Sequence, residues 1–149
     1  MKNSLIFLLL FTASACSSGE KADPQLEQAA AVHEEAMKIE EEARGKLDSL
    51  LQLKNSINVQ GRALTEAEQA FVREINGLEG RFQAWAESLI EVPGYEHDHD
   101  HEHGHDHHHH GKKAPEVTPG HMLNIQQEFR DSIAVLRQEA ERLLAEQEF

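Results

Sequence analysis

A strictly spaced row of apolar residues between positions 71 and 92 leaves few folds open to this chain. The intervals alternate between four and three residues along Phe71, Ile75, Leu78, Phe82, Trp85, Leu89 and Val92. This alternation is the a/d rhythm of helices that pack along a common seam. Thr65 and Glu68 precede the row at the spacing of a capping box. The pattern therefore predicts a helix over about 65–92.

Two further segments carry apolar stripes of helical period. The first follows Asp23-Pro24, and its stripe consists of Ala29, Val32, Ala36, Ile39, Ala43, Leu50, Leu53 and Ile57. The other follows Thr118-Pro119, and its stripe consists of Met122, Ile125, Phe129, Ile133, Leu136, Ala140 and Leu143. A cap residue followed by proline is a typical helix start. We predict helices over about 23–54 and 118–149.

Three helices of similar length, without strand-like alternation, predict an all-α fold. We expect an antiparallel, coiled-coil-like three-helix bundle, in which 23–92 forms a helical hairpin and 118–149 supplies the third helix. The seam of the second helix also allows a homodimer.

The N-terminus predicts export. Lys2 precedes an apolar run at 5–11 that is too short to cross a bilayer, which takes about 20 apolar residues. Small residues follow, so we interpret 1–15 as a signal peptide. The chain has one cysteine, Cys16, at the position of a lipobox cysteine, although Ala13 stands where leucine is usual. Ala13-Ser14-Ala15 also fits an ordinary cleavage site.

We expect Cys16 to be lipidated and 16–22 to form a polar tether. The protein would then be anchored in the outer membrane, on its periplasmic side or at the cell surface. The membrane is the first partner that this arrangement implies.

The segment 93–117 separates the second and third predicted helices and has no regular apolar pattern. A connection this long is uncommon in a compact domain unless it is functional or disordered. The segment lacks the apolar area that would offset the entropy of ordering it. We predict a disordered loop.

Residues 97–110 combine nine histidines with four acidic residues. Imidazole and carboxylate groups bind Zn²⁺, Cu²⁺ and Ni²⁺. The predicted metal ligands are His97, Asp98, His99, Asp100, His101, Glu102, His103, His105, Asp106, His107, His108, His109 and His110. Such interchangeable ligands predict labile binding of several ions, with zinc the main candidate and copper or nickel as alternatives.

Other interpretations of the run remain open. Histidine titrates near pH 6.5, so the run could act as a pH sensor, and it could also be a polar spacer. Outside it, His33 and His121 each have a methionine nearby in sequence, Met37 and Met122. A copper site of His and Met is conceivable there, but a surface or core-edge role is more common.

Several segments of the chain, taken together, resemble a known family. They are Cys16, the His-Glu-Glu-Ala-Met segment 33–37, Trp85 with 89–94, the histidine-rich run and 118–123. The combination resembles small His-rich lipoproteins of Bacteroidota, whose members often carry the label "viral A-type inclusion protein". The resemblance implies an exported helical lipoprotein and supplies no activity.

The formal net charge of −13 argues against nucleic-acid binding, which needs a basic face. No motif for a catalytic nucleophile, a zinc protease or a phosphate-binding loop is present, so we expect no enzymatic activity. Two functions remain. One is a cell-envelope lipoprotein that binds or buffers metal, with a metal transporter or envelope protein as partner. The other is a structural lipoprotein that docks a partner through its apolar seam.

Overall fold

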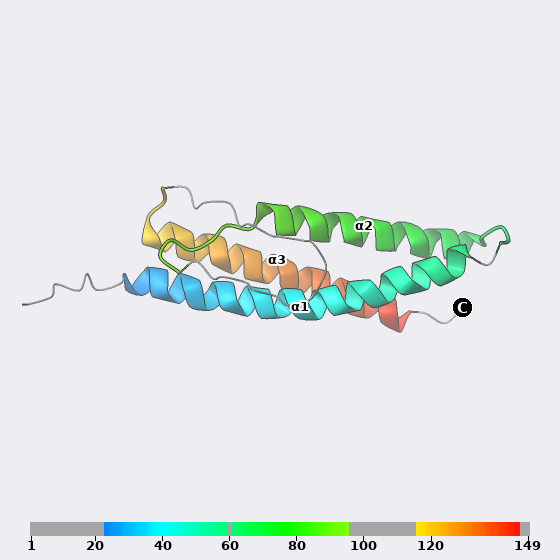
Figure 1. The fold of residues 1–149 in the computed structure, drawn as a ribbon, viewed down its shortest axis with the longest axis horizontal. Helices are drawn as coiled ribbons and strands as arrows, with labels where there is room; N and C mark the ends of the chain where they lie inside the picture. The colour runs from blue at the N-terminus through cyan, green and yellow to red at the C-terminus, as the bar shows by residue number, and fades with distance from the viewer. Residues whose placement is uncertain (1–22, 60, 96–115, 147–149) are drawn as a thin grey trace, which may run out of the picture.

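The structure is a computed structural model that describes residues 23–59, 61–95 and 116–146. These residues form three helices, α1 (Pro24–Asn58), α2 (Glu66–Ser88) and α3 (Pro119–Ala145), shown in Figure 1. No strand occurs in the three described ranges. The prediction of an all-α fold with three helices is confirmed.

Each helix begins at the predicted cap. The Asp23 carboxylate accepts a hydrogen bond from the backbone N–H two residues later, at 2.8 Å. Thr65 and Glu68 form both hydrogen bonds of the capping box, at 3.2 and 2.8 Å. The Thr118 hydroxyl accepts from the backbone N–H three residues later, at 3.3 Å. These bonds satisfy backbone donors that a helix start leaves free, and so they fix where each helix begins.

The helices are less similar in length than predicted. α1 has 35 residues, α2 has 23 and α3 has 27. α1 continues past the predicted end near residue 54 to Asn58, and Ile57 in its last turn is buried in the core. At about 1.5 Å per residue, α2 is shorter than α1 by roughly 18 Å.

α2 ends at Ser88, whereas the apolar row predicts a helix to Val92. From Leu89 the backbone is extended, with φ −56° and ψ 136°. Leu89 and Val92 are nevertheless buried, so the row continues into the core on non-helical backbone. The backbone carbonyl of Ile90 accepts a hydrogen bond from the Gln126 side chain of α3 at 2.7 Å. That tertiary bond is available because the segment leaves the helix.

The core consists of two clusters. The main cluster joins all three helices and contains the larger side chains of the α2 row, including Phe71, Ile75, Leu78, Phe82 and Trp85. A satellite core at the N-terminal end of α1 contains Ala29, Ala30, Val92 and Met122, with Leu26, Ile90, Tyr95, Val117 and Leu123 packed against it. The extended segment 89–95 thus takes the place beside α1 and α3 that the short α2 does not reach (Figure 1).

Ion pairs connect the three helices along their lengths. The pairs between α1 and α3 are Glu35–Arg130 at 3.6 Å, Glu42–Arg137 at 2.7 Å and Lys46–Glu141 at 3.4 Å. The pairs that involve α2 are Lys54–Glu79 at 3.0 Å, Arg81–Glu139 at 2.5 Å and Glu74–Arg142 at 2.9 Å. Such exposed pairs add little stability, and their order along the sequence shows the register in which the helices lie.

Candidate functional site

The residues predicted to bind metal, at 97–110, lie outside the described part of the chain, as does Cys16. Within the described ranges, no three or more His, Cys, Asp or Glu residues are grouped as a metal site would require. None of the described helices is both long enough and apolar enough to cross a membrane. The structure does describe the residues on either side of the histidine-rich segment, up to Tyr95 and from Glu116 onward.

Both flanks of that segment pack on the satellite core. Tyr95 precedes it and Val117 follows it, and both contact the cluster around Ala29, Val92 and Met122. Pro93 and Gly94 form a turn in which the Tyr95 N–H donates to the Val92 carbonyl at 3.0 Å. Gly94 has φ +80°, the conformation that a type II turn requires at its third residue. The structure therefore brings the described residues on either side of this segment, Tyr95 and Val117, to one end of the molecule.

A polar network lies beside this satellite core. His33 of α1 is 1% exposed and Gln126 of α3 is fully buried. The His33 Nδ1 atom and the Gln126 Oε1 atom are 2.9 Å apart. The Gln126 Nε2 atom donates to the Ile90 carbonyl at 2.7 Å and lies 3.6 Å from the Met122 sulfur. One buried glutamine thus connects α1, α3 and the extended segment.

This network determines which ring nitrogen of His33 carries hydrogen. A backbone carbonyl only accepts, so the Gln126 atom that faces Ile90 must be the NH₂ group. The other amide atom, which faces His33, is then the oxygen and also only accepts. His33 must therefore donate through Nδ1–H.

The second ring nitrogen of His33 faces a carboxylate. The Nε2 atom lies 3.8 Å from Oε2 of Glu91, whose side chain is 17% exposed. Glu91 belongs to the extended segment, directly after Ile90. Arg130, one turn beyond Gln126 on α3, is bound to Asp131 at 2.7 Å and to Glu35 at 3.6 Å. Its charge is therefore engaged by acids other than Glu91.

From the sequence, His33 is expected at the surface or the core edge, and Gln126 has no predicted role. The structure buries both, while His121 is exposed. A signal was present in the spacing. The buried positions of α1 include 29, 33, 36, 40, 43, 47 and 50, and those of α3 include 122, 126, 133, 136, 140 and 143. The α1 set follows intervals of four and three throughout, and the α3 set follows them except for one interval of seven between 126 and 133. Polar residues occupy some of these positions, so a search for apolar residues alone does not find them.

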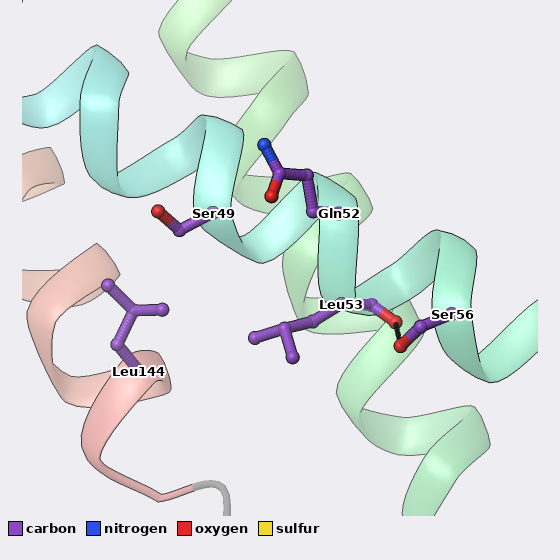
Figure 2. Close-up of a pocket in the computed structure, with 5 residues that line it drawn as sticks. All are labelled: Ser49, Gln52, Leu53, Ser56 and Leu144. Atoms are coloured by element: carbon purple, nitrogen blue, oxygen red, sulfur yellow. Dashed lines mark hydrogen bonds between the residues drawn. The ribbon is translucent and has the colours of Figure 1, made fainter.

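Two open hollows lie on the surface of the described structure. The larger, of about 470 Å³, lies between α1 and α3 and is lined by Ser49, Gln52, Leu53, Ser56 and Leu144 (Figure 2). The hydroxyls of Ser49 and Ser56 donate to carbonyls of their own helix, at 3.0 and 2.8 Å. No titratable side chain lines this hollow.

The smaller hollow, of about 300 Å³, is lined by Trp85, Ser88, Ile125, Glu128, Phe129 and Ser132. Its indole N–H donates to the Phe129 carbonyl at 3.0 Å, and its two serine hydroxyls also bond to backbone carbonyls. Glu128 is the one titratable side chain that lines it.

Comparisons with protein-family models, with curated proteins and with solved structures give no significant match for this chain. The candidate site and its chemistry therefore rest on the residues of this chain.

Proposed function

We propose that this protein is an exported, lipid-anchored helical protein of the cell envelope that binds or buffers divalent transition metal ions. The ligands are the nine histidines and four acidic residues of 97–110, and zinc is the main ion, with copper and nickel as alternatives. The observation that carries the proposal is this density of imidazole and carboxylate groups in fourteen consecutive positions. No catalytic step is part of the proposal.

The proposal also includes the finer description of the fold. We infer an antiparallel three-helix bundle. Most of the loop predicted over 93–117 lies outside the described residues, and its described ends carry Tyr95 and Val117, which pack on the satellite core. The order of the ion pairs supports the antiparallel arrangement. Along the paired residues the numbers rise together in α1 and α3, whereas between α2 and α3 they rise in one helix as they fall in the other. The packing of Tyr95 and Val117 on one satellite core supports a segment that starts and ends at the same place.

The membrane is part of the proposal through Cys16. A lipid on Cys16 and a tether over 16–22 would place the start of α1 near the outer membrane. The flanks of the histidine-rich segment pack beside that start, on Leu26, Ala29 and Ala30. The metal ligands would then lie close to the membrane surface, where a metal transporter or another envelope protein could exchange ions with them.

The alternative function, docking of a partner through the apolar seam, has less support. The seam residues Phe71, Ile75, Leu78 and Phe82 are buried by the chain's own helices. A partner would have to displace α1 or α3 to reach them. The pH-sensing alternative uses the same histidines, and protons compete with metal for the same nitrogen atoms.

Isothermal titration with Zn²⁺, Cu²⁺ and Ni²⁺ tests the proposal on residues 16–149 carrying Cys16→Ser. The matched control replaces the nine histidines of 97–110 with serine and keeps the four acidic residues and the length. We expect several ions per chain to bind the first protein, with affinity that falls as the pH is lowered, and most of that binding to vanish in the control. Equal binding by the two proteins would contradict the proposal.

A further inference from the structure

We propose that the smaller hollow, at the C-terminal end of α2, is a docking site for an arginine side chain that a partner protein presents. This inference goes beyond the proposed metal-binding function and does not depend on it, because it uses only described residues of α2 and α3. The hydrogen-bonding groups, the charges and the apolar surface of the hollow each favour this occupant.

The hollow lies between the last turn of α2 and the first half of α3. Trp85 and Ser88 contribute from α2, which ends at Ser88 and continues as extended backbone. The α3 residues that line the hollow lie on one face of the helix because they are three and four positions apart: Ile125, Glu128, Phe129 and Ser132. A volume of about 300 Å³ is at the lower limit for a small-ligand site, so the hollow admits one side chain rather than a helix.

The side chains that line the hollow have hydrogen-bond acceptors to offer but no spare donor. The Trp85 indole N–H and the Ser132 hydroxyl both donate to the Phe129 carbonyl, at 3.0 and 2.9 Å. The Ser88 hydroxyl donates to the Trp85 carbonyl at 2.8 Å. A serine oxygen that has donated its hydrogen still accepts, and an ionised glutamate only accepts. A ligand of this hollow must therefore bring the donors itself.

The charges at the hollow favour a cation. Glu128 is exposed, and none of the ion pairs described for α3 involves it. The nearby Arg130 is engaged by Asp131 and Glu35. The C-terminal end of a helix carries a partial negative charge, and the last turn of α2 contains no basic residue to offset it. The net charge of −13 adds a longer-range attraction for basic partners.

The apolar surface of the hollow selects arginine among the cationic side chains. Ile125 and Phe129 are only partly buried, so they leave apolar surface against which a methylene stem can pack. The guanidinium group is planar, carries five donors and stacks on aromatic rings, whereas the lysine ammonium is a strongly hydrated point charge. One such exposed contact binds weakly, so the arginine would act together with other contacts of the partner.

The test titrates residues 16–149 carrying Cys16→Ser with the blocked peptide acetyl-Gly-Arg-Gly-amide. The matched control peptide contains citrulline, which has nearly the same shape as arginine but no charge. The chain has one tryptophan, so the fluorescence of Trp85 and the NMR signal of its indole N–H report on the hollow itself. We expect the arginine peptide to shift both signals with a dissociation constant of about 1–10 mM, and the citrulline peptide to bind at least about fivefold more weakly.

Glu128→Gln removes the carboxylate charge and should weaken binding of the arginine peptide about threefold to fivefold, as expected for an exposed ion pair. Glu66→Gln is the matched control, because it makes the same charge change at the first residue of α2, roughly 33 Å along the helix from Ser88. It should leave the affinity unchanged. Both positions are exposed or on the first turn of a helix, and circular dichroism confirms that each variant keeps its fold.

Ser132→Lys places an ammonium group of the chain's own beside the hollow, at an exposed position, and should abolish the response of Trp85 to the arginine peptide. The proposal is overturned if the arginine and citrulline peptides bind equally well, or if the Trp85 signals do not respond. It is also overturned if Glu66→Gln weakens binding as much as Glu128→Gln does, because the attraction would then come from the net charge and not from the hollow. Tighter binding of the corresponding lysine peptide would contradict the choice of arginine.

Discussion

At the scale of single residues, Gln126 has an unusual position for a polar side chain. It is fully buried and bonds to α1 through His33 and to the extended segment through Ile90. Burying an amide costs little free energy when its hydrogen bonds are made. If one partner is removed, the other buried polar group is left without a hydrogen bond, which destabilises the fold. Gln126 therefore specifies how three segments meet and also orients the imidazole of His33.

Replacing Gln126 with leucine should destabilise the fold by about 2–4 kcal/mol. The change removes the acceptor of the His33 Nδ1–H and the donor to the Ile90 carbonyl, and each such loss in a buried place costs about 1–3 kcal/mol. Urea denaturation measures the difference. Asn124→Leu, at an exposed position of the same helix, is the control and should change the free energy of unfolding by less than about 0.5 kcal/mol.

Glu68 makes the fold sensitive to acid. Hydrogen bonds from the Arg62 guanidinium, then from the backbone N–H of Thr65, lower the pKa of Glu68 from 4.5 to about 2. A carboxyl whose pKa is lower in the folded chain contributes stability above its unfolded value. That contribution is complete above about pH 4.5 and is lost as the pH falls toward 2.

We accordingly expect Glu68→Gln to lose less stability than the parent chain between pH 4.5 and pH 2, the interval set by the two pKa values. Thermal unfolding followed by circular dichroism across this interval measures the slope. Glu66→Gln, exposed in the same first turn, should keep the parent slope. A Glu68→Gln slope equal to that of the parent would show that this carboxyl is not responsible.

At the scale of elements, the turn at Pro93-Gly94 closes the extended segment. Gly94→Ala should destabilise the fold by about 1–2 kcal/mol, because φ +80° is strained for a residue with a Cβ atom. Open space surrounds the position, so the cost comes from the backbone alone. Chemical denaturation provides the measurement.

Gly77→Ala is the matched control for that substitution. Gly77 lies inside α2 and also has open space around its Cβ position. Alanine favours helix over glycine, so the same change should stabilise the fold here by about 0.5–1 kcal/mol. Substitutions that changed stability in the same direction at both sites would contradict the assignment of the turn.

The elements also show which parts of the fold the sequence predicts. The three caps and the α2 row are local signals, and the structure follows them at Asp23, Thr65 and Thr118. The end of α2 is different, because the hydrogen bond from Gln126 to Ile90 joins residues 36 positions apart. A pattern read within one segment cannot contain that bond. The His33 network was missed for a related reason, since polar residues occupy seam positions where only apolar ones were sought.

At the scale of the whole molecule, the three helices of one chain bury one another's apolar residues. Among the described residues, the large apolar side chains left exposed are Val59 and Val135, on or next to different helices. We therefore expect residues 16–149 with Cys16→Ser to be monomeric, and sedimentation velocity over a range of concentrations measures this. If a dimer forms and Val135→Lys dissociates it, that face of α3 is an interface. Lys38→Ala, at an exposed position of α1, is the control and should leave the oligomeric state unchanged.

The common packing site of Tyr95 and Val117 has a consequence for how this protein can vary. When a connecting segment starts and ends at one place, its length is not dictated by a distance that it must bridge. For a flexible segment, doubling the length adds only about 0.6 kcal/mol to the cost of closing it. Duplication or loss of His-Asp pairs would then change the number of ligands while the helices keep their packing. Related chains should accordingly differ in the length of this run more than in the residues of the satellite core.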